Sequence, residues 1–467
     1  MATLSAESLD RIFKAYDIRG TVPDQLDTEV IERIGAAFAR FARDEAEAGR
    51  HGPADRVLLA HDMRPSGPEF AEAFARGVIS QGLDVVHLGL ASTDLLFWAS
   101  GHYDAPGAML TASHNPAEYN GVKLCLAGAK PVGIESGLAR IKADTLAGLP
   151  PSSKPGGTST LDALGPFVEH VHSFVDVGVL RPLRIVADAA NGMGGLIAPA
   201  VFSGLPFELE VLYGELDGTF PNHPADPIQP ENLRDLQARV VETGADVGLA
   251  FDGDADRVFL VDDRGEPLSG SLTTAIVASA ILDKHPGSTI LYNLICSKAV
   301  PEIIREKGGT PIRTRVGHSF IKQVMAETGA AFGGEHSGHY YFRDNYRADS
   351  GIIAALVVLE VLSRAGEPLS SLRVPYERYA ASGEINTRVR DAAAVIERVA
   401  AHYADAEQDR LDGLTVDLGD WWFNLRPSNT EPLLRLNLEA RDRESCERHV
   451  EEVRALIAAA DDATKGT

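Results

Sequence analysis

The feature that most constrains the fold is an alternation of helix and strand patterns along the chain. Residues 28–45 and 68–81 are predicted to be helices, and the apolar runs at 57–61 and 84–90 are predicted to be strands. Strands that alternate with helices are typical of a largely parallel sheet covered by helices. The chain is therefore expected to open with an α/β domain.

Two later segments repeat the alternation, and each of the three ends in a polar loop. A Pro/Gly/Ser-rich linker at residues 149–157 and a polar turn at 262–267 mark the boundaries between them. From about residue 375 the pattern changes to short strands in hairpin order with two helices, which is typical of an α+β domain. The expected domains are residues 1–153, 154–263, 264–375 and 376–467.

The net charge of −23 over 467 residues restricts the possible partners. Nucleic acid and anionic membranes both need a basic face, so neither is expected to bind, and an anionic substrate would need a locally basic pocket. The three cysteines lie far apart without the spacing of a zinc site. The chain begins without a signal-peptide pattern and has no apolar segment long enough to cross a bilayer. We expect a cytoplasmic protein.

Ser113 lies on a polar turn between two apolar runs, 106–110 and 122–126, that are predicted to be strands. A serine held on such a loop can reach into a cleft, although a lone serine on a turn is usually only a turn or capping residue. Its neighbours in the sequence are His114, Asn115 and Lys123. Three further stretches strengthen the functional interpretation.

Asp252, Asp254 and Asp256 alternate along a stretch between two predicted strands. Carboxylates at alternate positions of an extended chain point to one face, where they can converge on a hard cation such as Mg²⁺. A calcium-binding EF-hand would need glycine where Arg257 stands and glutamate where Asp263 stands, so that alternative fails. A solvated acidic turn is the remaining alternative.

Two more polar loops could contact a sugar phosphate. Glu335, Ser337 and His339 alternate between glycines, and such groups can hydrogen-bond to sugar hydroxyls or move a proton, although a glycine-bounded polar loop is common. Residues 426–432 offer a guanidinium, hydroxyls, an amide and backbone N–H groups, which suit a phosphate that is bound and not transferred. A nucleoside triphosphate is not implied, because the chain has no Walker A sequence.

Five motifs occur in a fixed order: FKAYDIRG at residues 13–20, TASHNP at 111–116, DGDADR at 252–257, GEHSGH at 334–339 and RPSNTEP at 426–432. In this combination the chain resembles the α-D-phosphohexomutase family over its whole length, and most of all the phosphomannomutase/phosphoglucomutase branch. The resemblance implies three related α/β domains with mixed sheets and a smaller C-terminal α+β domain around a central cleft. It also implies an intramolecular phosphotransferase.

The resemblance assigns a role to each motif. Ser113 would carry the phosphoryl group as phosphoserine, and its phosphate would hold Mg²⁺ together with Asp252, Asp254 and Asp256. The residues implied in catalysis are Ser113, Lys123, His339, Arg19 and His114, with Lys123 and His339 as candidates for proton transfer. The residues implied in substrate binding are Tyr16, Asn115, Arg257, His318, Glu335, Ser337, His339, Arg426, Ser428, Asn429 and Thr430.

The implied reaction converts a hexose 1-phosphate reversibly into a hexose 6-phosphate through a hexose 1,6-bisphosphate, which is also the activator. Phosphomannomutase activity is expected, with phosphoglucomutase activity beside it. His336 stands where this branch often has methionine, so a phosphoglucomutase or a phosphoglucosamine mutase stays an alternative, although the latter tends to have glycine in place of Asn429. A sugar-phosphate-binding regulator without turnover is a further alternative. The expected partners are small-molecule sugar phosphates, and the expected assembly is a monomer or a homodimer.

Overall fold

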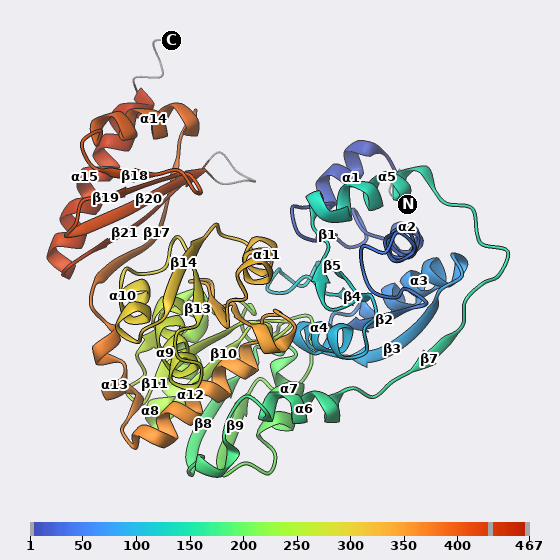
Figure 1. The fold of residues 1–467 in the computed structure, drawn as a ribbon, viewed down its shortest axis with the longest axis horizontal. Coiled ribbons are helices and arrows are strands. Elements are labelled where there is room, and N and C mark those ends of the chain that lie inside the picture. The colour runs from blue at the N-terminus through green and yellow to red at the C-terminus, as the bar shows by residue number, and fades with distance from the viewer. Residues whose placement is uncertain (1–3, 428–432, 463–467) are drawn as a thin grey trace.

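The structure, a computed structural model, describes residues 4–427 and 433–462, apart from the side chains of residues 318 and 319. This part of the chain forms three α/β units with mixed sheets and a fourth unit with an antiparallel sheet, as expected. The first unit lies to the right in Figure 1, and the C-terminal unit stands opposite it, above the other two. Within the described residues, no helix has the length and apolar character needed to span a membrane.

The first sheet is built on four strands: β2 (Arg56–His61), β3 (Asp84–Leu90), β4 (Gly107–Leu110) and β5 (Tyr119–Leu126). β2 lies between β3 and β4 and runs parallel to both, whereas β5 runs antiparallel to β4. The sheet is extended by β1 (Ile18–Thr21), β6 (Lys130–Pro131) and β7 (Thr158–Thr160). Because β7 follows the linker, this sheet reaches past residue 153, where the first domain is expected to end.

The next two sheets repeat this four-strand arrangement. The strands of the second are β8 (Leu183–Asp188), β9 (Phe207–Leu212), β10 (Val247–Phe251) and β11 (Val258–Asp262), with β12 (Pro267–Leu268) added to β11. Those of the third are β13 (Thr289–Asn293), β14 (Thr310–Thr314), β15 (Phe332–Gly334) and β16 (Tyr340–Phe342). In each sheet the first strand pairs in parallel with the second and third, and the fourth pairs antiparallel with the third. The common topology shows that the three units are related.

One loop has an equivalent place in all three units, between the third strand and its antiparallel partner. In the first unit this loop holds Ser113, in the second it holds residues 252–257, and in the third it holds residues 335–339. Loops at the carboxyl ends of parallel strands share one edge of their sheet, where α/β proteins bind ligands. The fold therefore directs three of the sequence motifs to corresponding edges.

Helices cover the sheets and join the units. They are α1 (Ala6–Ile12), α2 (Thr28–Glu47), α3 (Gly67–Ser80), α4 (Thr93–His102), α5 (Ala139–Ala147), α6 (Leu164–His172), α7 (Gly194–Phe202), α8 (Arg234–Thr243), α9 (Gly270–Lys284), α10 (Ala299–Glu306), α11 (His318–Thr328), α12 (Gly351–Ala365) and α13 (Leu369–Leu372). One apolar core includes Trp98 on α4, Ile185 on β8 and Leu356 on α12. The three α/β units are thus packed together through a shared core.

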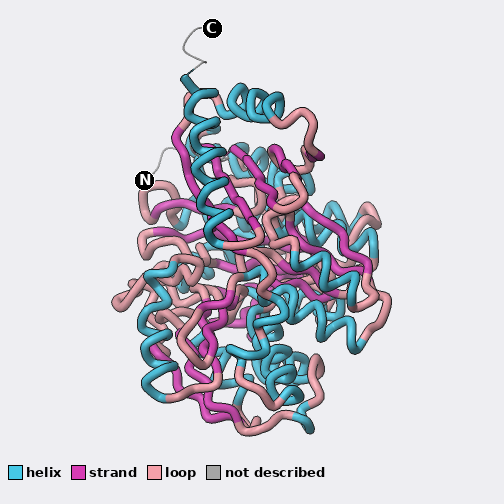
Figure 2. The backbone as a smooth tube through the Cα atoms, turned by 90° about the vertical axis from the view of Figure 1, so that its left-hand side faces the viewer, coloured by secondary structure: helices cyan, strands magenta, loops and turns pink. Residues whose placement is uncertain are grey.

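The fourth unit is an antiparallel sheet covered on one face. Its strands lie in the order β17 (Ala380–Arg388), β21 (Leu433–Ala440), β20 (Trp421–Pro427), β19 (Leu414–Asp417) and β18 (Glu407–Asp409). The helices α14 (Ala392–His402) and α15 (Arg443–Asp462) cover the face that carries Trp421, and α15 lies at the left in Figure 1 and towards the viewer in Figure 2. The opposite face carries polar side chains such as Glu439, which accepts a hydrogen bond from the backbone of Lys298. This polar face therefore packs against the third unit.

Candidate active site

Ser113 lies shortly after β4 in an unusual backbone conformation. Its φ of 51° is in the left-handed region, which costs a non-glycine residue on the order of 1–3 kcal/mol. The residue is only 3% exposed, and its hydroxyl donates to Oδ2 of Asp252 at 2.7 Å. Nδ1 of His114 lies 3.3 Å from the same Oγ. The loops of the first two units therefore meet at this hydroxyl.

Asp252, Asp254 and Asp256 form a buried cluster, with ligand atoms within 4.8 Å of one another. Nζ of Lys123, on β5, donates to Asp254 at 2.7 Å and to Asp256 at 2.6 Å. Nε of Arg257 donates to Asp252 at 3.0 Å. The cluster thus contains two cationic side chains and three carboxylates.

The carboxylate cluster fits a divalent cation. Burial raises the pKa of Asp252 to about 7, and the nearby Arg257 opposes that rise only in part. Oδ1 of Asp254 and Oδ1 of Asp256 are buried and have no hydrogen-bond partner among the described residues. Buried polar atoms usually have partners, and carboxylate oxygens are the ligands that Mg²⁺ prefers. The residues present are therefore suited to hold such an ion.

Gly253 allows the two loops to touch, because a Cβ there would lie 2.3 Å from the carbonyl oxygen of Ser113. We expect Gly253→Ala to force the loops apart, lower the free energy of unfolding by about 1–3 kcal/mol and reduce kcat at least about tenfold. Urea unfolding measures the first effect, and an activity assay measures the second. Gly165→Ala is the matched control, since a Cβ at Gly165 meets open space. A Gly253→Ala enzyme with unchanged kcat would show that this contact does not matter for activity.

A cavity of about 210 Å³ opens beside Ser113, and all three α/β units line it. Lys123 comes from the first unit, Arg257 from the second, and Ser337 and His339 from the third. The fold thus brings together groups that are more than two hundred residues apart in the sequence. Such a cavity can surround a small polar ligand next to the serine hydroxyl.

His339 is oriented by a buried ion pair. Its Nδ1 lies 2.8 Å from Oδ2 of Asp349, whose Oδ1 lies 2.8 Å from Nζ of Lys322. A carboxylate beside Nδ1 favours the tautomer that keeps Nε2 as the acceptor. Burial lowers the pKa of His339, but the carboxylates of Asp256 and Asp349 outweigh burial and raise it. His339 is therefore held as a group able to exchange a proton.

Glu335 is placed differently from its two partners in the third loop. It is 2% exposed and lies outside the lining of the Ser113 cavity. Its carboxylate accepts hydrogen bonds from the hydroxyl of Tyr341 at 2.7 Å and from the N–H of Gly317 at 3.2 Å. In this structure Glu335 ties the third loop to the strand and helix beside it.

Arg19 reaches the serine loop from β1, where its Nη1 donates to Oδ1 of Asn115 at 2.6 Å. His114 is half-buried near Arg257 and other cations, so that desolvation and the charge of Arg257 hold its pKa well below the ordinary value. The imidazole beside Ser113 is therefore biased towards its neutral form. Tyr16 lies outside the Ser113 cavity and lines a neighbouring one of about 600 Å³.

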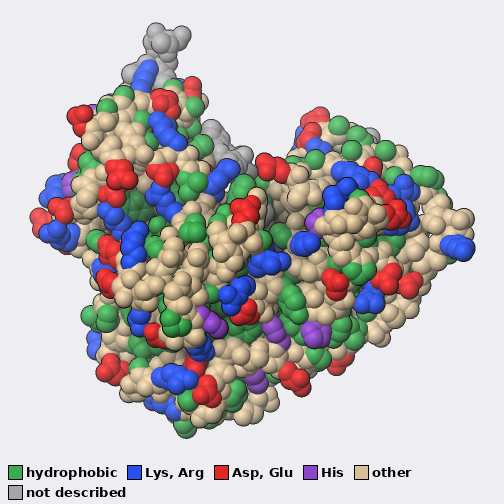
Figure 3. Space-filling view, viewed as in Figure 1, with side chains coloured by type: hydrophobic (Ala, Val, Ile, Leu, Met, Phe, Trp, Pro, Cys, Tyr) green, Lys and Arg blue, Asp and Glu red, His purple; other side chains and the backbone are tan. Residues whose placement is uncertain are grey.

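Arg426, near the end of β20, donates to Oε2 of Glu384 at 2.8 Å. His336 of the third loop lines one pocket with Gly383 and Asn437 of the fourth unit, so the two units meet beside this loop. Figure 3 shows the molecule hollowed between the C-terminal unit and the first unit. Ser428, Asn429, Thr430 and the side chain of His318 lie outside the described residues.

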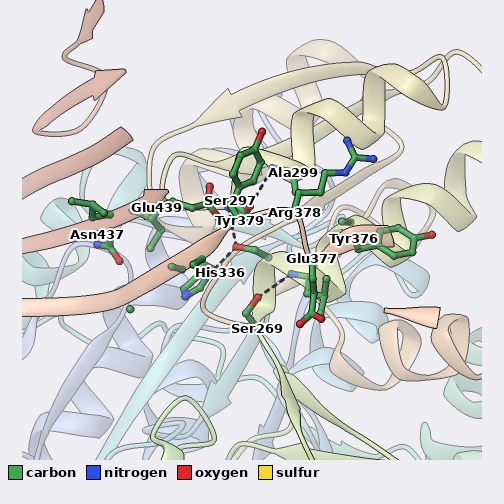
Figure 4. A pocket seen from close by; sticks show the side chains of 18 of the residues that line it. Ser269, Ser297, Ala299, His336, Tyr376, Glu377, Arg378, Tyr379, Asn437 and Glu439 are labelled. Atoms are coloured by element: carbon green, nitrogen blue, oxygen red, sulfur yellow. Dashed lines mark hydrogen bonds between the residues drawn. The ribbon is translucent and has the colours of Figure 1, made fainter. Parts of the chain in front are cut away.

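His336 faces the junction with the fourth unit. Its Nδ1 is 2.9 Å from Oγ of Ser271, and Figure 4 shows it beside a pocket with Ser297, Asn437 and Glu439. Ser337 instead lines the Ser113 cavity, so the two neighbours in this turn face different pockets. The histidine at position 336, where the phosphomannomutase/phosphoglucomutase branch often has methionine, therefore faces this junction and not the Ser113 cavity.

Several residues of the site carry no motif in the sequence. Thr93, at the start of α4, donates through Oγ1 to Oδ2 of Asp254. Asp349 and Lys322 act on His339, and Asp62 and Arg64 act on the serine loop. Thr93, Asp62 and Arg64 follow strands of the first sheet, and a polar residue at such a strand end was the only signal that could have pointed to them.

The fold and site together define a class of enzyme. Three units of one topology present a buried serine, carboxylates fit for a divalent cation and a polar loop to one region, which is suited to phosphoryl transfer. The chain matches four domains described as phosphoglucomutase/phosphomannomutase, namely α/β/α domain I at residues 10–147, domain II at 165–265, domain III at 269–379 and the C-terminal domain at 384–456. The chain belongs to the phosphoglucomutase/phosphomannomutase family.

Individual relatives are similar to this chain over nearly its full length and theirs. A protein of Xanthomonas campestris pv. campestris named phosphohexose mutases is 41% identical over 95% of this chain and 98% of its own. The phosphomannomutase of Escherichia coli K12 is 36% identical over 92% of this chain and 94% of its own. A phosphoglucomutase/phosphomannomutase family protein from Burkholderia thailandensis, at 34% identity, superposes with a TM-score of 0.86 over 98% of both chains.

Proposed function

We propose that this protein is a phosphohexomutase with phosphomannomutase as its main activity, interconverting mannose 1-phosphate and mannose 6-phosphate. The observation that carries the proposal is the contact of Ser113 Oγ with Asp252, beside a cavity also lined by Ser337 and His339. Relatives named phosphomannomutase, at 36–38% identity over 92% of the chain, support the substrate. The proposed setting is the cytoplasm, with sugar phosphates as partners.

In the first half-reaction Ser113 carries a phosphoryl group. The bond from its Oγ to phosphorus breaks and a bond from the 6-hydroxyl oxygen of the hexose 1-phosphate to that phosphorus forms. The hydroxyl proton passes to a nearby base, and the released Ser113 Oγ takes up one proton to become a hydroxyl again. His339, oriented by Asp349, is the proposed base. Burial lowers the pKa of Lys123, but Asp254 and Asp256 outweigh burial and raise it, so this amine stays charged. Lys123 therefore suits charge neutralisation better than proton transfer.

In the second half-reaction the hexose 1,6-bisphosphate rotates end over end in the cleft, and its 1-phosphoryl group is transferred back to Ser113. Arg426, with Ser428, Asn429 and Thr430, is proposed to bind the phosphate that is not reacting, while Ser337 contacts sugar hydroxyls. Glu335 is proposed to do the same, which requires its carboxylate to release Tyr341 or Gly317. Tyr16, Arg19, His114, Asn115, Arg257 and His318 complete the proposed site. Mg²⁺ held by Asp252, Asp254 and Asp256 with the Ser113 phosphate would neutralise charge on the transferred group.

The substrate is tested by comparing kcat/KM on mannose 1-phosphate, glucose 1-phosphate and glucosamine 1-phosphate, with a trace of glucose 1,6-bisphosphate as activator. We expect turnover of mannose 1-phosphate, with glucose 1-phosphate next, since the family description and the Burkholderia structure include phosphoglucomutase. A clear preference for glucosamine 1-phosphate would overturn the assigned substrate. Binding of all three without turnover would point to a regulator.

A further inference from the structure

Both sides of the Ser113 backbone are held by buried groups. Oγ1 of Thr111 accepts the N–H of Ser113 at 2.9 Å and donates to Oδ2 of Asp62 at 2.7 Å. The same Oδ2 lies 3.3 Å from Nε of Arg64, and Nη2 of Arg64 donates to the carbonyl oxygen of Ser113 at 2.9 Å. These contacts form a closed ring that begins and ends on Ser113.

Arg64 also binds the rest of the serine loop. It donates to the carbonyl oxygens of Asn115 at 2.7 Å, Pro116 at 2.8 Å and Tyr119 at 2.8 Å. Arg64 is only 1% exposed, so its guanidinium donors are shielded from water. Arginine suits the task because its donors form a rigid planar fork, whereas lysine offers a single flexible ammonium.

These contacts fix the direction of the loop peptides. The C=O and N–H of one trans peptide point to opposite sides, so binding the Ser113 carbonyl to Arg64 turns the N–H of His114 away from Arg64. Phe220 of the second unit covers the guanidinium, whose carbon lies 5.2 Å from the ring centre. Arg64 is therefore held from both units that meet at Ser113.

We propose that Arg64 is a positioning residue for the reaction: its hold on four loop carbonyls keeps Ser113 in its left-handed conformation, with Oγ against Asp252. The inference rests on the proposed role of Ser113 as the phosphoryl carrier. Arg64 acts through the loop backbone and does not line the cavity beside Ser113. Its loss should slow loading and unloading of the serine more than it weakens substrate binding.

The test compares Arg64→Lys with wild type and with Arg43→Lys. Arg43 is a matched control because it donates to a single carbonyl, that of Gln81, in the same unit. Labelling of Ser113 by glucose 1,6-bisphosphate is followed by mass spectrometry, alongside kcat, KM and Tm. For Arg64→Lys we expect labelling rate and kcat to fall about a hundredfold, with KM within about threefold. Arg43→Lys should label at the wild-type rate.

A folded Arg64→Lys protein that labels Ser113 at the wild-type rate would overturn the proposal. If Arg64→Lys does not fold, Thr111→Val decides, because it breaks the ring while keeping Arg64 and the side-chain shape. It should label about tenfold more slowly, and an unchanged rate would again overturn the proposal. Wild type that turns over substrate without label on Ser113 would overturn the proposed function itself, and this inference with it.

Discussion

Replacing Ser113 with alanine is expected to abolish mutase turnover and leave the fold intact. The change removes the oxygen that we propose carries the phosphoryl group, so kcat should fall by at least about four orders of magnitude. Stability should change by only about 1 kcal/mol, the typical contribution of the single hydrogen bond from Oγ to Asp252. A coupled assay with glucose 1,6-bisphosphate present measures the first effect, and urea unfolding measures the second.

Ser203→Ala controls for the loss of a serine hydroxyl, because Ser203 is exposed just after α7, and it should turn over normally. Mg²⁺ binding should persist in Ser113→Ala, since the three aspartates remain. Activity of Ser113→Ala above about one hundredth of wild type would mean that another group carries the phosphoryl.

The second large effect is expected from Asp254→Asn. Oδ1 of Asp254 is buried and unpaired, and Oδ2 binds Lys123 and Thr93, so an amide would replace a charged ligand and weaken two further contacts. We expect kcat to fall at least about a hundredfold and half-maximal activity to require more Mg²⁺. A Mg²⁺ titration of the EDTA-treated enzyme measures both.

Asp283→Asn is the control for this substitution, because Asp283 is an exposed residue paired with Lys307. It should leave the Mg²⁺ titration unchanged. If the Asp254→Asn enzyme had the wild-type kcat and the same Mg²⁺ requirement, the aspartate cluster would have no role in the mechanism.

The sequence predicts buried elements better than exposed ones. The buried strands β2, β4 and β5 appear close to the apolar runs at residues 57–61, 106–110 and 122–126 that predict them. β7 and β18 are not predicted, because they are edge strands of exposed or half-buried polar residues that show no apolar alternation. The topology that the three units share is also not visible as a repeated sequence, because topology depends on strand order and direction and not on side-chain identity.

Some residues of the site can be predicted from the sequence and others cannot. Its loops can be predicted because Ser113, the aspartates and the polar third loop are local motifs. Arg64 cannot, because its partners are backbone carbonyls that carry no residue identity. Lys123 follows Ser113 closely in sequence, yet its ammonium binds Asp254 and Asp256 of another unit, which only tertiary packing reveals.

The most direct test of the phosphoserine account is to incubate the purified enzyme with glucose 1,6-bisphosphate and map the phosphate by peptide mass spectrometry. We expect one phosphate on the peptide that contains Ser113, and we expect it to disappear when hexose 6-phosphate is added, because the phosphoryl group is then transferred to the sugar. Turnover with no phosphate on Ser113, or with a phosphate there that hexose 6-phosphate does not remove, would contradict this account.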